Sequence, residues 1–319
     1  MRILFAGSPD ISATLLKHLL ENQKNGYWQV AGVLTNPDAP KGRKAELLPT
    51  SVAQIASTLA PGIPLFKFEH LDAFAREEIS KVKADLLVCF AYGKIFGPKF
   101  MALFPMGGIN VHPSLLPAYR GCAPVPAAIL NCEKETGVTV QKLAQEMDTG
   151  DILLQQKILL DGSENSESLL AKAAEISLNM VTKVLENYAE GKTEGLKQEG
   201  NASYSQMLKK EDGLIDWSES AEKIDAKIRA FYPWPGAFTQ SAGSLLRIHE
   251  AVIYKKDFPA ESEAESGCVL GTDKSSGIIV KTGKGLLALK NVQLQGKKAM
   301  NWKDFMNGSR NYVGTVLGK

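Results

Sequence analysis

Three side chains of different chemistry stand in the middle of the chain, each beside residues that favour loops: Asn110, His112 and Asp148. An amide N–H can hold a developing oxyanion, and an imidazole can donate a hydrogen bond or move a proton. A carboxylate can orient the imidazole and accept the proton that a nucleophile loses. Together these groups suit acyl transfer by direct attack, which needs neither a covalent enzyme intermediate nor a metal ion.

The spacing of the first two residues places them on one face of a strand. Asn110 and His112 are two positions apart in an apolar run, and the side chains of a strand alternate between its faces. In an isolated pair of this kind, the asparagine more often closes a turn, and the histidine is more often a partly buried residue whose hydrogen bonds are satisfied. Here the pair is followed by 113–117, with its two prolines, and later by Asp-Thr-Gly-Asp at 148–151. This context favours a site.

The elements that must carry these residues alternate between strands and helices. Apolar runs typical of buried strands are found at 2–6, 30–34, 85–90, 108–111 and 138–143. Patterns typical of helices are found at 51–59, 72–82, 123–130 and 166–188. The alternation predicts an α/β domain with a doubly wound, mostly parallel sheet. Ligands of such sheets bind outside the carboxyl ends of the strands, where we expect all three side chains.

The length of 319 residues predicts two domains, because single hydrophobic cores stop growing at roughly 250–300 residues. We predict a catalytic domain over 1–189, a polar linker over 190–206 and a second domain over 207–319. The second domain begins with a helix near 221–231. Short strand-like runs follow, which predict a small β-barrel: 245–253, 267–271, 277–281 and 286–294.

Composition excludes several classes of protein. With 44% hydrophobic and 23% charged residues, the chain is typical of a soluble globular protein. No apolar run reaches the roughly 20 residues of a membrane span, and no signal peptide is evident, so we expect a cytoplasmic protein. The four cysteines form no Cys-x-x-Cys pair, and we expect them to be reduced. The glycine patterns of nicotinamide and ATP sites are absent.

The charge is uneven along the chain. Residues 207–319 carry 17 Lys and Arg against 13 Asp and Glu, and the last fifty residues carry nine against two. A polyanionic partner for this end is one interpretation, and an ordinary basic surface is the other. Near the other end, Lys41, Arg43 and Lys44 stand in a stretch whose composition predicts a mobile loop. Such a loop could grip a phosphate backbone, although ordinary solvated lysines would look the same.

Several motifs together resemble the folate-dependent formyltransferases. The resemblance covers essentially the whole chain. It is carried by the start Arg-Ile-Leu-Phe-Ala-Gly-Ser-Pro-Asp and by segments 91–95, 108–112, 114–117, 119–121, 135–139, 147–151, 215–217 and 229–236. The Asn-x-His, Ser-Leu-Leu-Pro and Asp-Thr-Gly-Asp motifs are the most specific of these. The fold implied is a Rossmann-like formyltransferase domain followed by an OB-like barrel.

The resemblance implies transfer of a formyl group from 10-formyltetrahydrofolate, a co-substrate, to the α-amino group of methionine on initiator tRNA. Asn110, His112 and Asp148 then match the catalytic trio of the family, and no metal takes part. The residues that would contact folate are Ser114, Leu115, Leu116, Pro117 and Tyr92.

The resemblance also bears on partners. Lys41, Arg43 and Lys44 match an insertion that meets the tRNA acceptor arm, and the barrel would contact the inside of the tRNA. We expect a monomer with no membrane partner.

Two alternatives remain open. One is a related folate enzyme that acts on an amino sugar nucleotide or a purine precursor, or that releases formate. The other is a non-catalytic RNA-binding module on the same fold.

Overall fold

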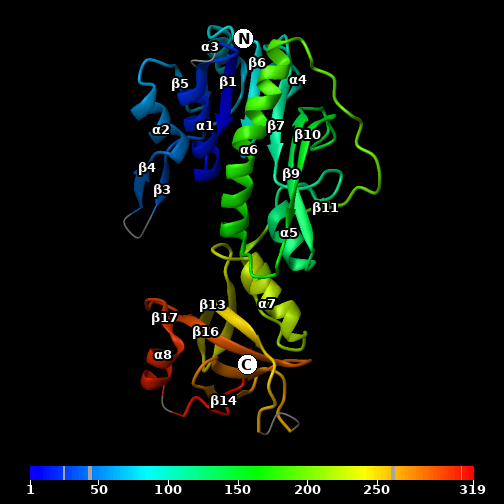
Figure 1. Cartoon of the computed structure of the whole chain (residues 1–319). Coiled ribbons are helices and arrows are strands. Elements are labelled where there is room, and N and C mark those ends of the chain that lie inside the picture. The colour runs from blue at the N-terminus through cyan, green and yellow to red at the C-terminus, as the bar shows by residue number, and fades with distance from the viewer. Residues whose placement is uncertain (24–25, 42–44, 260–262, 310) are drawn as a thin grey trace. The chain divides into compact units, whose positions relative to one another are not determined.

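The structure is a computed structural model that describes residues 1–23, 26–41, 45–259, 263–309 and 311–319 (Figure 1). The chain divides into two compact units. Unit 1 comprises Met1–Pro124, Glu135–Leu159 and Leu170–Ser205, and unit 2 comprises Val125–Lys134, Leu160–Leu169 and Gln206–Lys319. Each unit has its own sheet and is described by itself.

The centre of unit 1 is a seven-stranded sheet of order β10-β9-β7-β6-β1-β2-β5. From β7 to β5 all neighbouring strands are parallel, which confirms the predicted mostly parallel α/β fold. Strands β1, β2 and β6 are nearly continuous apolar runs, as expected of parallel strands whose two faces are covered by helices. The bounds are β1 (Arg2–Gly7), β2 (Gln29–Leu34), β5 (Leu65–Phe66), β6 (Leu86–Phe90), β7 (Gly108–His112), β9 (Glu135–Lys142) and β10 (Ile152–Leu159).

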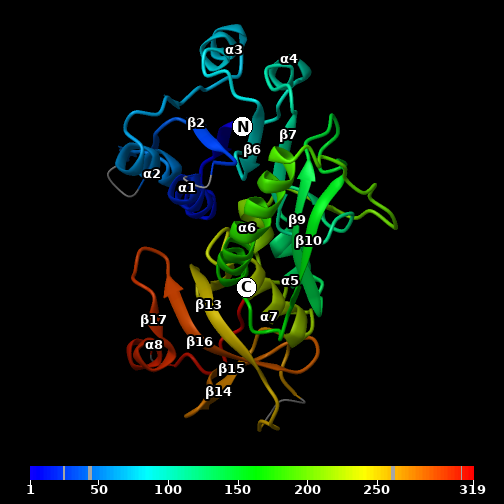
Figure 2. The same cartoon turned by 45° about the horizontal axis from the view of Figure 1, so that its top comes forward.

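Helices lie on both sides of these strands. On one side, His18 Nε2 of α1 (Asp10–Asn22) lies 2.9 Å from Thr182 Oγ1 of α6 (Ser166–Ala189). Figure 2 shows α3 (Ala73–Ser80) and α4 (Pro98–Met101) separated from those two helices by the strands. The remaining helices that begin in unit 1 are α2 (Ser51–Leu59) and α5 (Pro124–Leu130).

Strand β9 differs from the expectation in its direction. It runs antiparallel to β7, so that Thr139 pairs with His112 and Lys142 pairs with Ile109. The carboxyl end of β9 therefore lies beside the beginning of β7, away from His112. The prediction that Asp148 stands at the carboxyl end of a parallel strand is wrong, because the chain returns through β9 and β10 as an antiparallel pair.

Two segments expected to be irregular contain regular pairing. Strands β3 (Ala39–Lys41) and β4 (Glu46–Leu48) form an antiparallel hairpin within the early basic segment. In the segment expected as a linker, β11 (Tyr204–Ser205) pairs with β8 (Arg120–Gly121), and Leu196 pairs with Ile152. Residues up to Ser205 thus belong to unit 1.

Unit 2 is built on an antiparallel sheet of order β12-β13-β16-β15-β14, with β17 paired to β16. The expectation of a small β domain at this end is confirmed. Its core joins Ile224 and Ile228 of α7 to Leu246, Leu289 and Phe305. The bounds are η2 (Lys210–Gly213), α7 (Ala221–Ala230), β12 (Ala237–Ser241), β13 (Ser244–Tyr254), β14 (Val269–Asp273), β15 (Gly277–Lys281), β16 (Leu286–Leu294), β17 (Met300–Asn301) and α8 (Trp302–Gly308).

Candidate active site

Strand β7 positions two of the three predicted residues. Asn110 and His112 project from the same face of this strand because the strand period is two. His112 is 4% exposed, and Asn110 is partly exposed. The structure thus places an amide and an imidazole side by side at the end of a buried strand, as the spacing predicts.

The hydrogen-bond partner of His112 fixes its tautomer. Nε2 lies 2.9 Å from the backbone oxygen of Tyr119, which can only accept, so Nε2 carries a proton. Nδ1 faces Asp148 Oδ2 at 3.5 Å. Burial lowers the pKa of His112, and the negative charge of Asp148 opposes this shift. A neutral ring in this orientation presents the lone pair of Nδ1 and can take up a proton there.

Asp148 reaches the same place from the loop 143–151, between β9 and β10. Its Oδ1 accepts a hydrogen bond from Gln141 Nε2 at 2.7 Å and lies 3.5 Å from Asn110 Nδ2. Its Oδ2 accepts from the backbone N–H of Gly121 at 2.8 Å. The carboxylate is thereby held against His112 while its side chain is only 9% exposed. The structure brings all three predicted residues together.

The loop reaches β7 by turning back on itself. The backbone N–H of Lys142 donates to the oxygen of Asp151 at 2.9 Å, which closes the loop. Asp148 has φ of 56°, in the left-handed region that short polar side chains tolerate. A Cβ on Gly150 would lie 1.8 Å from the oxygen of Lys142. The glycine of the Asp-Thr-Gly-Asp motif is therefore required by the close approach of two backbone segments.

The segment 114–117 is held by a local hydrogen bond and by a polar contact to β9. Ser114 Oγ donates to the oxygen of Ala118 at 2.6 Å, and the N–H of Leu116 donates to Thr139 Oγ1 at 3.2 Å. The side chains of Ser114 and Leu116 are buried, whereas Leu115 and Pro117 are partly exposed. A bound ligand could meet the backbone of this segment and the last two side chains.

Tyr92 lies in the core of unit 1. It is 1% exposed, and its ring stacks on Phe96 with centroids 5.4 Å apart. Burial raises the pKa of Tyr92 to about 12, so its hydroxyl stays protonated. The backbone oxygen of Tyr92 accepts from Asn36 Nδ2 at 2.9 Å. Both residues line an open cavity of about 430 Å³ at the carboxyl ends of β1, β2 and β6.

The basic residues predicted to meet RNA are only partly within the described chain. Lys41 ends β3 and pairs in register with Glu46. Arg43 and Lys44 lie outside the described residues.

Two glutamines at the site were not foreseen. Gln141 lies opposite Asn110 in the β7–β9 register, and Gln198 Nε2 donates to the backbone oxygen of Asp148 at 2.8 Å. Gln141 is a polar residue two positions from Thr139 in an otherwise apolar run, so the spacing that identified Asn110 could have identified it. Gln198 stands in a polar segment where nothing in the sequence distinguishes it.

Within the described ranges, no group of three or more His, Cys, Asp or Glu side chains is arranged to hold a metal ion. None of the helices described there has the length and apolar character that a bilayer crossing needs.

Comparison with known proteins matches two family models to consecutive parts of the chain. Residues 1–185 match the formyl transferase family, and residues 207–310 match the formyl transferase C-terminal domain. A methionyl-tRNA formyltransferase of Treponema denticola is 46% identical over 321 residues, covering 98% of each chain.

Two solved structures share the fold. A methionyl-tRNA formyltransferase from Clostridium thermocellum superposes with a TM-score of 0.59 at 20% identity, covering 81% of this chain and 95% of that one. HypX from Aquifex aeolicus, solved with tetrahydrofolic acid, gives 0.66 at 16% identity, covering 98% of this chain and 48% of that one. With both family domains matched in order along the chain and a near full-length relative at 46% identity, this protein belongs to the formyl transferase family.

Proposed function

We propose that this enzyme transfers the formyl group of 10-formyltetrahydrofolate to the α-amino group of methionyl-initiator tRNA. The observation that carries the proposal is the meeting of Asn110, His112 and Asp148 within 3.5 Å contacts on a buried strand end. The full-length similarity to methionyl-tRNA formyltransferases supports the choice of acceptor. The product is the formylated aminoacyl-tRNA with which translation can begin.

The mechanism follows from the hydrogen positions at His112. An α-amino group titrates near ~8 in model compounds, so part of the acceptor is a free amine at neutral pH. Its nitrogen forms a bond to the formyl carbon, which leaves negative charge on the formyl oxygen and a positive charge on the nitrogen. The Asn110 amide donates to the oxygen. Nδ1 of neutral His112 takes the proton from the nitrogen, and the Asp148 carboxylate stabilises the imidazolium that results.

The second half of the reaction returns that proton. The bond from the formyl carbon to the folate nitrogen breaks, and this nitrogen gains the proton from His112 Nδ1. Atoms and charge then balance, because the amine has lost one proton and the folate nitrogen has gained one. The products are the formylated amine and tetrahydrofolate, and His112 is neutral again.

The co-substrate is proposed to lie against the segment 114–117. Leu115 and Pro117 are the residues of this segment that are left partly accessible. A flat ring packed there would place its attached arm near the end of β7, beside Asn110. The ring of Tyr92 is enclosed by the core, so its proposed contribution to folate binding is through the backbone.

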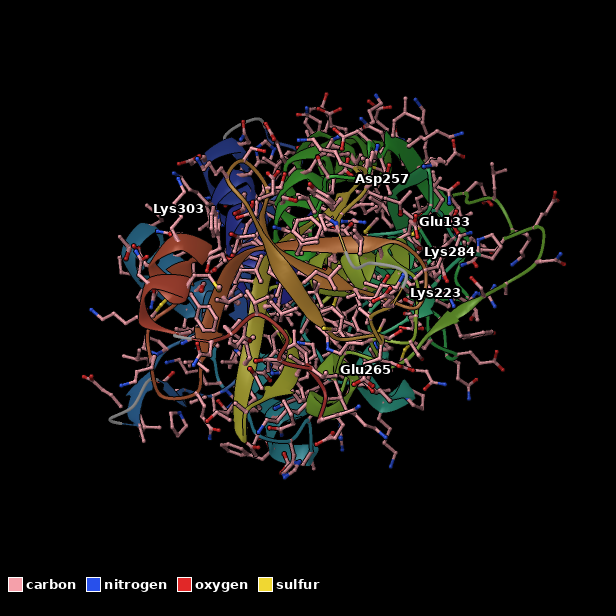
Figure 3. All side chains as sticks on the ribbon, turned by 90° about the horizontal axis from the view of Figure 1, so that it is seen from below. Glu133, Lys223, Asp257, Glu265, Lys284 and Lys303 are labelled. Atoms are coloured by element: carbon pink, nitrogen blue, oxygen red, sulfur yellow. The ribbon has the colours of Figure 1, made fainter. Side chains whose placement is uncertain are left out.

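The tRNA is proposed to contact unit 2 and the early basic segment that contains Lys41, Arg43 and Lys44. In unit 2, Lys303 Nζ lies 5.6 Å from the ring centroid of Trp302, a pairing of charge and aromatic surface that suits RNA. Figure 3 shows Lys303 on one side of this unit and Lys223 and Lys284 on the other. Contacts spread in this way suit a long polyanion. We propose a monomer that works in the cytoplasm.

The experiment that tests the function offers the purified protein 10-formyltetrahydrofolate with three acceptors: methionyl-initiator tRNA, an amino sugar nucleotide and water. Rapid formylation of the tRNA is expected. Faster formylation of the sugar, or release of formate without an acceptor, would contradict the proposal.

Affinity for the tRNA should fall steeply with salt while affinity for folate changes little, because phosphate contacts release counterions. A tRNA affinity independent of salt would contradict the RNA part.

A further inference from the structure

Residues 196–205, hereafter the strap, cross between the two loops that complete the site. At one end, the N–H and oxygen of Leu196 exchange hydrogen bonds of 2.8 and 2.7 Å with Ile152, just after the loop of Asp148. At the other end, Ser203 Oγ accepts from the N–H of Tyr119 at 2.8 Å, and its oxygen accepts from the N–H of Arg120 at 2.9 Å. The strap therefore joins the loop of Asp148 to the loop that contacts His112.

Gln198 lies in the strap and directly supports the loop of Asp148. Its Nε2 donates to the backbone oxygens of Asp148 and Gly150, at 2.8 and 2.9 Å. Its Oε1 accepts from Nε and Nη2 of Arg120, at 3.0 and 2.7 Å. The orientation of this amide is unambiguous, because a guanidinium only donates and a carbonyl only accepts. Arg120 thus turns the amide donors towards the loop and polarises them.

A second path runs from Gln198 to the carboxylate itself. Gln198 Nε2 lies 3.4 Å from Gln141 Oε1, and Gln141 Nε2 donates to Asp148 Oδ1 at 2.7 Å. Gln141 is 2% exposed, so this path is shielded from water. The backbone and the side chain of Asp148 are therefore both tied to one amide, which is itself held by a fixed positive charge.

We propose that Gln198 is a positioning residue for the formyl transfer, which it serves by fixing the Asp148 carboxylate beside Nδ1 of His112. This inference rests on the proposed function, since it names a residue that acts on the same site. Gln198 acts through the two backbone oxygens that it holds and through Gln141. Arg120 orients the Gln198 amide, and its Nη1 is anchored in turn by the hydroxyl of Tyr204 at 3.2 Å.

Replacement of Gln198 by Glu separates this role from a simple anchor for Arg120. The carboxylate keeps the size and the acceptors that face Arg120, but it has no N–H for the oxygens of Asp148 and Gly150. We expect kcat to fall roughly 10- to 100-fold, because small misplacements of catalytic groups cost up to about 100-fold, with KM for both substrates nearly unchanged. Gln156→Glu, on an exposed position of β10, makes the same charge change and is expected to leave kcat as it is.

The pH profile gives a readout that a purely structural role would not move. The charge of Asp148 raises the pKa of His112, so a displaced carboxylate lets that pKa fall. The acid limb of kcat, where His112 becomes protonated, is then expected at lower pH in Gln198→Glu than in the wild type. An unchanged kcat, or an effect confined to KM, would overturn the proposal.

A double-variant cycle keeps the proposal testable if the Gln198→Glu chain is less stable. In the background of Asp148→Asn, the same change at Gln198 is expected to cost little further activity, since its target is already gone. Full, independent losses from the two changes would overturn the proposal. The wild-type reaction with methionyl-tRNA tests the function itself. The ratio between variants tests the role of Gln198, so the two can fail separately.

Discussion

The two halves of the site are built in different ways. Asn110 and His112 come from β7, a strand buried between β6 and β9, and their juxtaposition needs only the alternation of a strand. Asp148 comes from the loop 143–151, and its place depends on Gln141, Gly121 and Gln198, which are distributed from residue 121 to residue 198.

The geometry of the loop half is expected to be more easily disturbed than that of the strand half. The strand half is supported by a sheet whose backbone pairs on both sides, so changes of side chain there remove chemistry and leave geometry. The loop half has a backbone in the left-handed region at Asp148 and a glycine pressed against Lys142. Changes at a distance from the loop can therefore move its carboxylate.

The largest effect is expected for Asp148→Asn. The amide keeps the size of the side chain, and asparagine tolerates the left-handed backbone, but the negative charge beside His112 is lost. We expect kcat to fall roughly 10³- to 10⁴-fold, because without this charge the imidazolium of His112 is no longer stabilised and His112 loses most of its effect as the proton-transfer group. Single-turnover formyl transfer measures it. Glu146→Gln, exposed in the same loop, is the control, and an equal loss there would point to the loop charge in general.

Asn110→Ala is expected to come next. Loss of one oxyanion donor costs about 2.7–4 kcal/mol in other enzymes, so turnover is expected to fall by roughly two to three orders of magnitude. Because β7 is held by its neighbours, the melting temperature and the folate affinity are expected to stay near those of the wild type. Near-normal turnover with intact folate binding would remove Asn110 from the mechanism. A large loss of stability would break the contrast between the two halves.

Gly150→Ala tests the loop half through its backbone. The added Cβ overlaps the oxygen of Lys142, so the loop must shift, at a cost of about 1–3 kcal/mol in the free energy of unfolding. Activity is expected to fall together with stability, as Asp148 moves with the loop. Urea unfolding and kcat measure the two effects. Gly62→Ala, where nothing lies within 4 Å of the new Cβ, is the matched control.

The smallest effect concerns pH and the stability of the fold. Burial keeps the pKa of His112 below 6.5 in the folded protein, so the unfolded chain binds a proton first as the pH falls. The contribution of His112 to stability is therefore present above about pH 6.5 and declines below it, by at most about 1.4 kcal/mol per pH unit. The stability of the wild type relative to His112→Gln is expected to decrease from about pH 8 to about pH 5.5. A constant difference would show that His112 titrates alike in both states.

The strand half of the site and most of the framework around it follow from local sequence patterns. The alternation of apolar runs and helical patterns predicted the parallel sheet, and helix α2 begins and ends at the predicted residues, 51 and 59. Its beginning is marked locally, because Thr50 Oγ1 accepts from the N–H of Ala53. These features depend on neighbours within a few residues along the chain, which a sequence displays directly. The spacing of Asn110 and His112 is information of the same kind.

The position of Asp148 beside His112 depends on tertiary contacts that the local pattern does not show. The direction of β9 could not be inferred from its apolar pattern, because a strand has the same alternation whichever way it runs. The sequence of the strap does not indicate a role for Gln198. That role depends on the positions of Arg120, Asp148 and Gly150 around its amide in the folded chain. Contacts between residues this far apart in the sequence are selected by packing and by the need of buried polar groups for partners. In this protein, local sequence patterns identify the residues that can carry out the chemistry, and long-range hydrogen bonds fix how these residues are arranged.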